Sequence, residues 1–141
     1  MAEQKFILIR GICGSGKSTF AKQLVEYYHC LYNNATHLEA DQFFEDADGN
    51  YNWNPELLYA AHKWCQSSTY EALKKGNTVV VSNTFTTKKE LKPYFEIAKE
   101  FNIIPVVILC ENQFGNVHNV PEETLEKMRS RFQYDITDLF L

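Results

Sequence analysis

Apolar runs of strand length alternate with stretches of helical periodicity along this chain. Uninterrupted aliphatic and β-branched runs are typical of parallel strands covered on both faces, and here they predict strands at residues 6–10, 35–40, 78–81 and 105–109. Strands that alternate with helices indicate βαβ units. The pattern therefore predicts a three-layer α/β fold around a parallel sheet of about four to five strands, with the run 78–81 near its centre.

Apolar positions three and four residues apart predict the helices that separate these strands. Their expected bounds are residues 17–28, 54–75 and about 87–101, and another helix is expected to begin at Pro121. Asn54 and Thr87 favour helix N-termini, and Thr87 is followed by Glu90 as in a capping box. Because Pro93 lacks an amide N–H, we expect the helix after Thr87 to start late or to kink.

Length and composition suit a single folded domain spanning residues 1–141. The chain is 45% hydrophobic and contains ten Phe, eight Tyr and two Trp, which provide enough apolar surface for a core. Its net charge is −4, and its Lys and Arg are spread out, unlike the basic stripe of proteins that grip a long duplex. The apolar run at 6–9 is too short for a signal peptide or membrane span, so we expect a cytoplasmic protein.

Residues 11–18 read Gly-Ile-Cys-Gly-Ser-Gly-Lys-Ser, which fits the phosphate-loop pattern G-x-x-x-x-G-K-[ST] between a predicted strand and a predicted helix. Backbone N–H groups in such a loop face an anion at a helix N-terminus. Lys17 is expected to reach the β- and γ-phosphates of ATP, and the Ser18 hydroxyl to bind Mg²⁺. The residues expected to contact the nucleotide are Gly11, Cys13, Gly14, Ser15, Gly16, Lys17, Ser18 and Thr19.

The four cysteines are widely spaced and form no C-x-x-C pair, so neither a zinc site nor a disulfide framework is expected. Cys13 lies inside the phosphate loop, where N–H dipoles could lower the pKa of its thiol. The alternative is that its side chain only fills a position at which the backbone binds the phosphate.

A phosphate loop serves proteins that hydrolyse a nucleotide and proteins that transfer its γ-phosphoryl group to a hydroxyl. Transfer requires a base, which α/β proteins place at the carboxyl end of a strand. Asp41 follows the run 35–40 and fits that position, although it could instead cap a turn. Ser82, rather than an acid, ends the run 78–81, so Mg²⁺ would rest mainly on Ser18, phosphate oxygens and water.

Several sequence blocks, taken in order, resemble the polynucleotide-kinase-like P-loop family. The phosphate loop is followed by Ala-Asp-Gln-Phe-Phe at 40–44 and by Tyr-Asn-Trp-Asn-Pro-Glu-Leu-Leu at 51–58 with Ala-His at 61–62. Similar blocks continue at 81–84, 91–94 and 116–121, so the resemblance covers nearly the whole chain.

The resemblance implies a kinase that moves the γ-phosphate of ATP to a hydroxyl, typified by the 5′-hydroxyl ends of DNA or RNA. Asp41 matches the family's general base, and Asn83 and Thr84 match residues near the acceptor. A polar turn between a strand and a helix would explain Asn83 and Thr84 equally well. Residues 111–120 lack periodicity and form a candidate lid loop, in which His118 matches a recurrent family residue. A histidine in a loop could equally serve hydrogen bonding or packing.

Two arginines of the family pattern are missing from this chain. The lid arginine is replaced by Phe114 and Gly115, and Phe44 stands three residues after Asp41, where phage-type polynucleotide kinases carry an arginine. Arg129 or Arg131 could substitute if it faces the site, or both could be solvated surface residues.

Two alternative functions remain open on the sequence. The first is a kinase for a small molecule such as a nucleoside, sugar or antibiotic, which the acidic net charge and missing acceptor arginine favour. The second is a nucleotide-binding switch or adaptor with weak or absent catalysis, for which the apolar residues 139–141 would form a contact.

Overall fold

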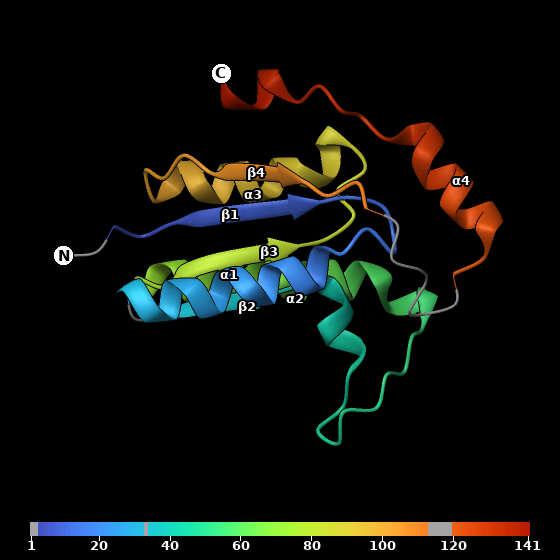
Figure 1. Cartoon of the computed structure of the whole chain (residues 1–141), viewed down its shortest axis with the longest axis horizontal. Helices are drawn as coiled ribbons and strands as arrows, with labels where there is room; N and C mark the ends of the chain where they lie inside the picture. The colour runs from blue at the N-terminus through green and yellow to red at the C-terminus, as the bar shows by residue number, and fades with distance from the viewer. Residues whose placement is uncertain (1–2, 33, 113–119) are drawn as a thin grey trace.

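The computed structural model describes residues 3–32, 34–112 and 120–141. Its sheet has four parallel strands in the order β2-β3-β1-β4. Figure 1 shows them side by side: β1 (Phe6–Arg10), β2 (Ala35–Leu38), β3 (Thr78–Ser82) and β4 (Val106–Leu109). The predicted α/β class with a parallel sheet is confirmed, and β3 occupies an internal position, as its continuous β-branched sequence predicts.

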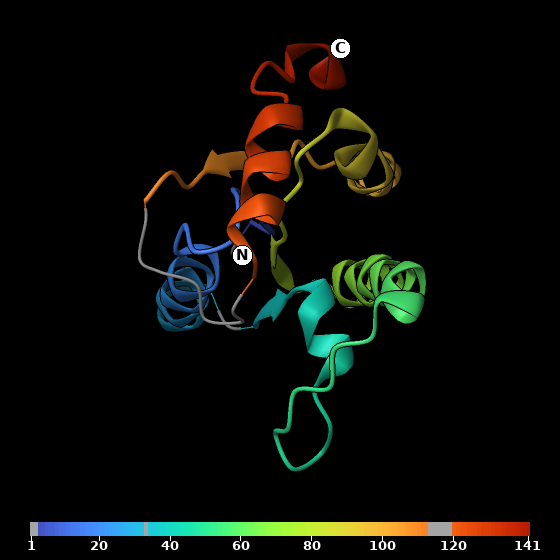
Figure 2. The same cartoon turned by 90° about the vertical axis from the view of Figure 1, so that its right-hand side faces the viewer.

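In the described ranges, four α-helices connect or follow these strands. They are α1 (Lys17–Tyr32), α2 (Leu58–Lys74), α3 (Lys88–Glu100) and α4 (Glu122–Arg131). Short 3₁₀ helices are η1 (Ala40–Phe44), η2 (Pro55–Leu57) and η3 (Thr137–Phe140). Viewed end-on in Figure 2, α1 lies on one face of the sheet and α2 and α3 lie on the other, which gives the expected three layers.

The alternation of side chains along β1 explains how both layers of helices are held. Phe6 and Leu8 pack in one core cluster with residues of α2 and α3, whereas Ile7 and Ile9 pack against α1. All five residues of β1 are buried. A strand covered on both faces is expected to be apolar, and residues 6–9 of β1 fit this expectation, whereas the buried Arg10 at its end requires polar partners.

Three helices differ from their expected bounds or shape. The helix expected over residues 54–75 begins with a 3₁₀ turn at Pro55–Leu57, and its α-helical part is Leu58–Lys74. Helix α1 runs to Tyr32 rather than ending near residue 28. The third starts directly after Thr87 even though Pro93 lies within it. Pro93 removes one ladder hydrogen bond, but the capping box between Thr87 and Glu90 satisfies the N-terminus, with Glu90 Oε2 2.9 Å from the Thr87 amide N. The buried face of the helix provides further stabilisation.

A buried arginine joins the end of β1 to the C-terminal segment. The Arg10 guanidinium donates from Nε and one terminal nitrogen to the Phe85 carbonyl oxygen, at 3.0 and 2.7 Å, and it stacks 4.3 Å from the centre of the Phe132 ring. Burial lowers the pKa of Arg10, and the nearby Glu90 opposes this shift. Beyond Phe132 the chain packs back on α3, where the Phe95 and Phe140 rings lie 4.9 Å apart.

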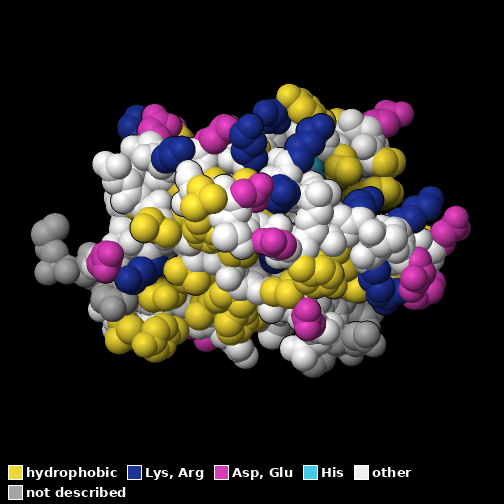
Figure 3. Space-filling model, turned by 90° about the horizontal axis from the view of Figure 1, so that it is seen from above, with side chains coloured by type: hydrophobic (Ala, Val, Ile, Leu, Met, Phe, Trp, Pro, Cys, Tyr) yellow, Lys and Arg dark blue, Asp and Glu magenta, His cyan; other side chains and the backbone are white. Residues whose placement is uncertain are grey.

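The outer surface mixes both signs of charge with separate apolar patches, as Figure 3 shows for the face seen from above. Ile104, Val106 and Leu109, at the edge of the sheet around β4, are exposed. Within the described ranges, no helix has both the length and the apolar character required to cross a bilayer.

Replacing Arg10 by Ala should lower the free energy of unfolding by about 2–4 kcal/mol, because buried carbonyl groups lose their charged donor and Phe132 loses its stacking partner. Urea unfolding followed by circular dichroism measures this change. Arg129, which is exposed and paired with Glu122, provides the matched control, and Arg129→Ala should change the midpoint little. Equal effects of the two substitutions would contradict the structural role of Arg10.

Candidate active site

A cavity of about 1410 Å³ lies at the carboxyl ends of the strands. Its walls come from the loop after β1, the junction of β2 with η1, the end of β3 and the start and end of α4. Figure 2 looks at this edge of the sheet, and α4 crosses it. Open α/β sheets bind their ligands at this edge, so the cavity is the candidate functional site.

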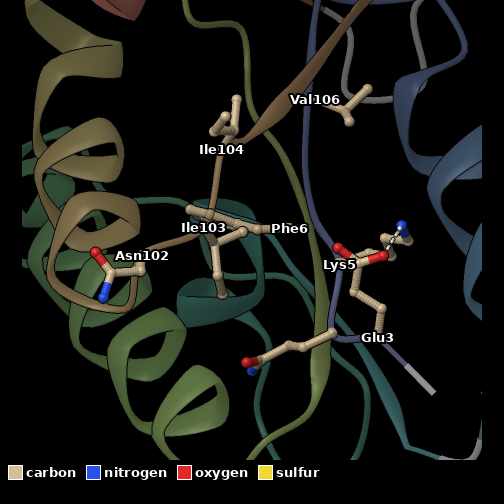
Figure 4. Close-up of a pocket in the computed structure, with 8 residues that line it drawn as sticks. Glu3, Lys5, Phe6, Asn102, Ile103, Ile104 and Val106 are labelled. Atoms are coloured by element: carbon tan, nitrogen blue, oxygen red, sulfur yellow. Dashed lines mark hydrogen bonds and ion pairs between the residues drawn. The ribbon is translucent and has the colours of Figure 1, made fainter. Parts of the chain in front are cut away.

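A smaller hollow of about 380 Å³ lies at the opposite edge, near the amino ends of β1 and β4 (Figure 4). Its lining combines the exposed ion pair of Lys5 with Glu3 and the apolar side chains of Ile103, Ile104 and Val106. The phosphate loop and Asp41 do not line this hollow. We therefore assign the candidate chemistry to the larger cavity.

Contacts with the two neighbouring strand ends hold the phosphate loop in place. The Gly11 amide donates to the Thr84 carbonyl oxygen at 3.2 Å. A Cβ atom on Gly11 would lie 2.5 Å from the Cys110 carbonyl oxygen and 2.6 Å from Ser15 Oγ, so only glycine fits there. Gly16 has a φ of 90°, in the left-handed region that glycine adopts readily.

The loop presents unused donors where α1 begins. In the described part of the chain, no acceptor is hydrogen-bonded to the amide groups of Gly14 and Gly16, and Ser15 Oγ is buried without a hydrogen-bond partner. These donors precede Lys17, the first residue of α1, so they lie at the positive end of the helix dipole. This arrangement fits a phosphate group, as the sequence motif predicts.

Lys17 is folded back onto the loop. Its Nζ donates to the Ile12 carbonyl oxygen at 3.0 Å. Burial lowers the pKa of Lys17, and negative charge on groups such as Glu39 and Asp41 acts in the opposite direction. The ammonium group therefore lies inside the cavity with a neutral partner that a phosphate oxygen could replace.

Cys13 differs from the expectation that loop dipoles lower its pKa. The main effect is burial, which raises the pKa of the Cys13 thiol, while Lys17 acts in the opposite direction. The thiol lines the cavity as a neutral group.

Ser18 and the end of β2 are joined by a partly buried polar network that the sequence analysis missed. Glu39 Oε2 accepts hydrogen bonds from Ser18 Oγ at 2.6 Å and from Ser82 Oγ at 2.9 Å. His37 Nε2 lies 2.7 Å from Ser82 Oγ. Because the Ser82 hydroxyl donates to Glu39, the His37 ring must donate to Ser82, which requires a proton on Nε2.

The order of the strands explains why Glu39 reaches Ser18. β2 pairs with β3, and β3 pairs with β1, so the residues after all three strands meet at one edge. Glu39 could have been noticed in the sequence as an acid at the carboxyl end of the second strand. Its partner Ser18 could not be identified without the strand order. Burial lowers the pKa of His37 despite the nearby Glu39, which favours a neutral ring.

Asp41 lies in η1 and lines the cavity with Lys17 and Ser18. The Tyr51 hydroxyl donates to Asp41 Oδ1 at 3.2 Å. Burial and then the Asp41 charge raise the pKa of Tyr51 well above its ordinary value, so the phenol remains a donor. The backbone between them folds back through an antiparallel bridge of Glu45 with Tyr51.

Asn83 and Thr84 both line the cavity, but they are also tied into the fold. Asn83 Oδ1 accepts a hydrogen bond from the Ala40 amide at 2.9 Å, and its Nδ2 lies 3.8 Å from Cys65 Sγ. The Thr84 carbonyl accepts from Gly11. Asn83 thus holds the backbone immediately before Asp41.

The two C-terminal arginines differ in position. Arg131 lines the cavity, and its Nε donates to Thr86 Oγ1 at 3.1 Å. Arg129 is not among the lining residues, and it forms ion pairs with Glu122 and Glu126 on the helix surface. Within the expected lid at 111–120, residues 113–119, and with them Phe114, Gly115 and His118, lie outside the described residues.

The arrangement of Ser18 and Glu39 fits a magnesium ion better than a metal held only by protein. No group of three or more His, Cys, Asp or Glu side chains with metal-binding geometry occurs in the described ranges. Mg²⁺ is usually held by one or two protein oxygens together with phosphate oxygens and water. A serine hydroxyl next to a carboxylate, facing a phosphate loop, is such a partial donor set.

Comparisons with known sequences agree with this geometry. A family model described as an AAA domain matches residues 6–134. A Pasteurella multocida protein of uncharacterized function is 28% identical over 134 residues, which cover 89% of this chain and 74% of that protein. The bifunctional polynucleotide phosphatase/kinase of Schizosaccharomyces pombe is 28% identical over 143 residues, 92% of this chain but 30% of that protein.

Solved structures share the fold. The Pnkp1/Rnl/Hen1 RNA repair complex contains a chain that matches with a TM-score of 0.68 at 20% identity, over 95% of this chain and 45% of that chain. A gluconokinase from Sinorhizobium meliloti matches with a TM-score of 0.63 at 15% identity, over 99% of this chain and 81% of that chain. This chain thus spans less than half of the polynucleotide kinase relatives described here. It belongs to the AAA domain family, and its fold is that of the P-loop kinases.

Proposed function

We propose that this protein transfers the γ-phosphoryl group of ATP to a hydroxyl, and that the acceptor is the 5′-hydroxyl end of a polynucleotide. The observation that carries the proposal is that Asp41, Lys17 and Ser18 line one cavity at the carboxyl edge of the sheet. A phosphate loop alone serves many reactions. A carboxylate in the same cavity adds the proton acceptor that transfer to a hydroxyl needs.

The phosphate loop binds and orients the triphosphate. The amide groups of Gly14 and Gly16 and the N-terminus of α1 provide donors for phosphate oxygens. Lys17 exchanges the Ile12 carbonyl for the phosphates and offsets negative charge as the γ-phosphoryl group moves. Ser18 Oγ would hold Mg²⁺, whose charge offsets that of the β- and γ-phosphates.

Asp41 acts on the acceptor. Its carboxylate accepts the proton of the hydroxyl while the hydroxyl oxygen forms a bond to the γ-phosphorus. The bond from that phosphorus to the β,γ-bridging oxygen breaks, and ADP leaves. The hydrogen bond from Tyr51 fixes the carboxylate orientation, and Asn83 fixes the backbone just before it.

Aromatic side chains beside Asp41 support a nucleic acid acceptor. Tyr51 and Trp53 line the cavity, and Trp53 is 54% exposed although it is large and apolar. Stacking of one base on such a ring contributes about 1–3 kcal/mol. An acceptor that enters by its end does not need the long basic surface that this chain of net charge −4 lacks. The similarity to the yeast polynucleotide phosphatase/kinase supports the same class.

A small-molecule acceptor is the second candidate, and Phe44 is the residue that favours it. This side chain, which replaces the arginine expected to grip an acceptor phosphate, is 5% exposed and packs in the core. It cannot contact an acceptor. The likeness to a gluconokinase over 99% of this chain makes a polyol or sugar hydroxyl a concrete rival.

Replacing Asp41 by Asn should lower the transfer rate by about 10²–10⁴-fold and leave ATP binding close to wild type, because only the proton acceptor is lost. The assay follows labelled γ-phosphate from ATP·Mg²⁺ to 5′-hydroxyl RNA and DNA oligonucleotides, to nucleosides and to gluconate. Labelling of oligonucleotides that depends on Asp41 supports the proposal. If only gluconate or nucleosides are labelled, the protein is a small-molecule kinase and the proposal of a polynucleotide acceptor fails.

Replacing Lys17 by Ala should weaken ATP binding and lower the transfer rate by about 10²–10³-fold, because the transferring phosphoryl group loses a charged donor. Lys92→Ala is the matched control, since Lys92 is exposed on α3 and does not line the cavity. Initial rates at saturating ATP and a binding isotherm separate the two effects. A Lys17 variant with wild-type rates would exclude the phosphate loop as the site of chemistry.

A further inference from the structure

A carboxylate lies where the phosphate-loop serine should bind its metal ion. Glu39 Oε2 accepts hydrogen bonds from the hydroxyls of Ser18, on α1, and Ser82, at the end of β3. The Glu39 side chain is 17% exposed and lines the cavity. It therefore faces the same space as the phosphate loop while it is largely removed from bulk water.

Among the described residues, no Lys or Arg forms an ion pair with Glu39, although the Glu39 charge acts on Lys17 in the same cavity. In the described part of the chain, the partner of Glu39 within ion-pair distance is His37, whose Nε2 lies 3.7 Å from Glu39 Oε2. Removing most of a carboxylate from water is costly when its direct hydrogen bonds come from two hydroxyls, so a cation at this place would be favoured.

The distance between the two oxygens suits a shared magnesium ion. Mg²⁺ binds oxygen at about 2.0–2.1 Å in an octahedron, so neighbouring ligand oxygens lie about 2.9 Å apart. Ser18 Oγ and Glu39 Oε2 are already 2.6 Å apart. A small adjustment converts their direct hydrogen bond into two adjacent metal ligands.

Building on the phosphotransferase proposed above, we infer that Glu39 is the acidic group of the metal site and that, with Ser18, it holds the Mg²⁺ that accompanies ATP. It takes the place of an acid at the end of β3, where this chain has Ser82. A serine at the end of β3 suits an acid at position 39. The Ser82 hydroxyl donates a hydrogen bond to Glu39, whereas a second carboxylate at position 82 would repel it.

Neighbouring residues keep Glu39 in position. His37 supports Ser82 at 2.7 Å, and Gln42 Oε1 accepts a hydrogen bond from the Glu39 amide at 3.2 Å. Gln42 Nε2 also donates to the His37 carbonyl oxygen at 3.2 Å. These contacts make Ser82 and Gln42 positioning residues. If Glu39 served only to tie β2 to β3 and α1, the same contacts would be present. In that case, replacing Glu39 would not change the effect of Mg²⁺ on ATP affinity.

Calorimetric titration of ATP, with Mg²⁺ and then with EDTA, tests this inference without any acceptor. We define the Mg²⁺ advantage as the affinity for ATP with Mg²⁺ divided by the affinity for ATP with EDTA. Glu39→Gln keeps the side-chain length and an oxygen acceptor for Ser18, and it should reduce this advantage by about 10- to 100-fold. Metal-free ATP should bind the variant at least as well as wild type, because a negative charge near the phosphates is removed.

Asp41→Asn is the matched control, because it removes the same charge from the same cavity. It should keep most of the Mg²⁺ advantage. An unchanged ratio in Glu39→Gln, or an equal reduction in both variants, would overturn the assignment of Glu39. If the chain binds ATP·Mg²⁺ through Glu39 but transfers no phosphate, the metal inference stands and the proposed function fails.

Ser82→Ala provides a second variant that leaves the charge in place. Losing one hydrogen bond to Glu39 should reduce the Mg²⁺ advantage by about tenfold, the effect expected of a residue that orients a metal ligand. Thermal unfolding without ligand checks that each variant folds. A folded Ser82→Ala with the wild-type ratio would contradict the positioning role of Ser82.

Discussion

The parallel pairing of β1 with β3 and β4 is the constraint on which the candidate site depends. Beyond the strands, the pairing continues into the loops. The Gly11 amide bonds to the Thr84 carbonyl, the Asn83 amide bonds to the Ile9 carbonyl at 3.2 Å, and the Cys110 amide bonds to the Arg10 carbonyl at 2.8 Å. Because parallel strands end at one edge, this register brings the phosphate loop next to the residues that follow β3 and β4.

Two carboxylates at the same edge have separate environments, and this separation supports the division of work proposed for them. Glu39 faces Ser18 and Ser82, whereas Asp41, two residues later in η1, accepts a hydrogen bond from Tyr51. The first is oriented toward the phosphate loop and the second toward the aromatic side of the cavity. In this account Glu39 binds the metal ion and Asp41 acts on the acceptor hydroxyl.

Much of the fold could be predicted from the sequence, because apolar runs and capping residues act locally. The strands, the capping box at Thr87 and the phosphate loop are all read from short segments. The role of Glu39 could not be predicted, because it depends on β2 lying next to β3. Likewise, the choice between Arg129 and Arg131 depends on how α4 is rotated over the cavity, which sequence spacing alone does not define.

The most direct test of the central claim is the partition of the γ-phosphoryl group between an acceptor and water. The measurement is the amount of labelled phosphate on a 5′-hydroxyl oligonucleotide relative to inorganic phosphate after ATP·Mg²⁺ is consumed. The account predicts that most of the label is found on the oligonucleotide end and that ATP consumption requires the acceptor. Release of all the label as inorganic phosphate, at a rate that no acceptor changes, would contradict it.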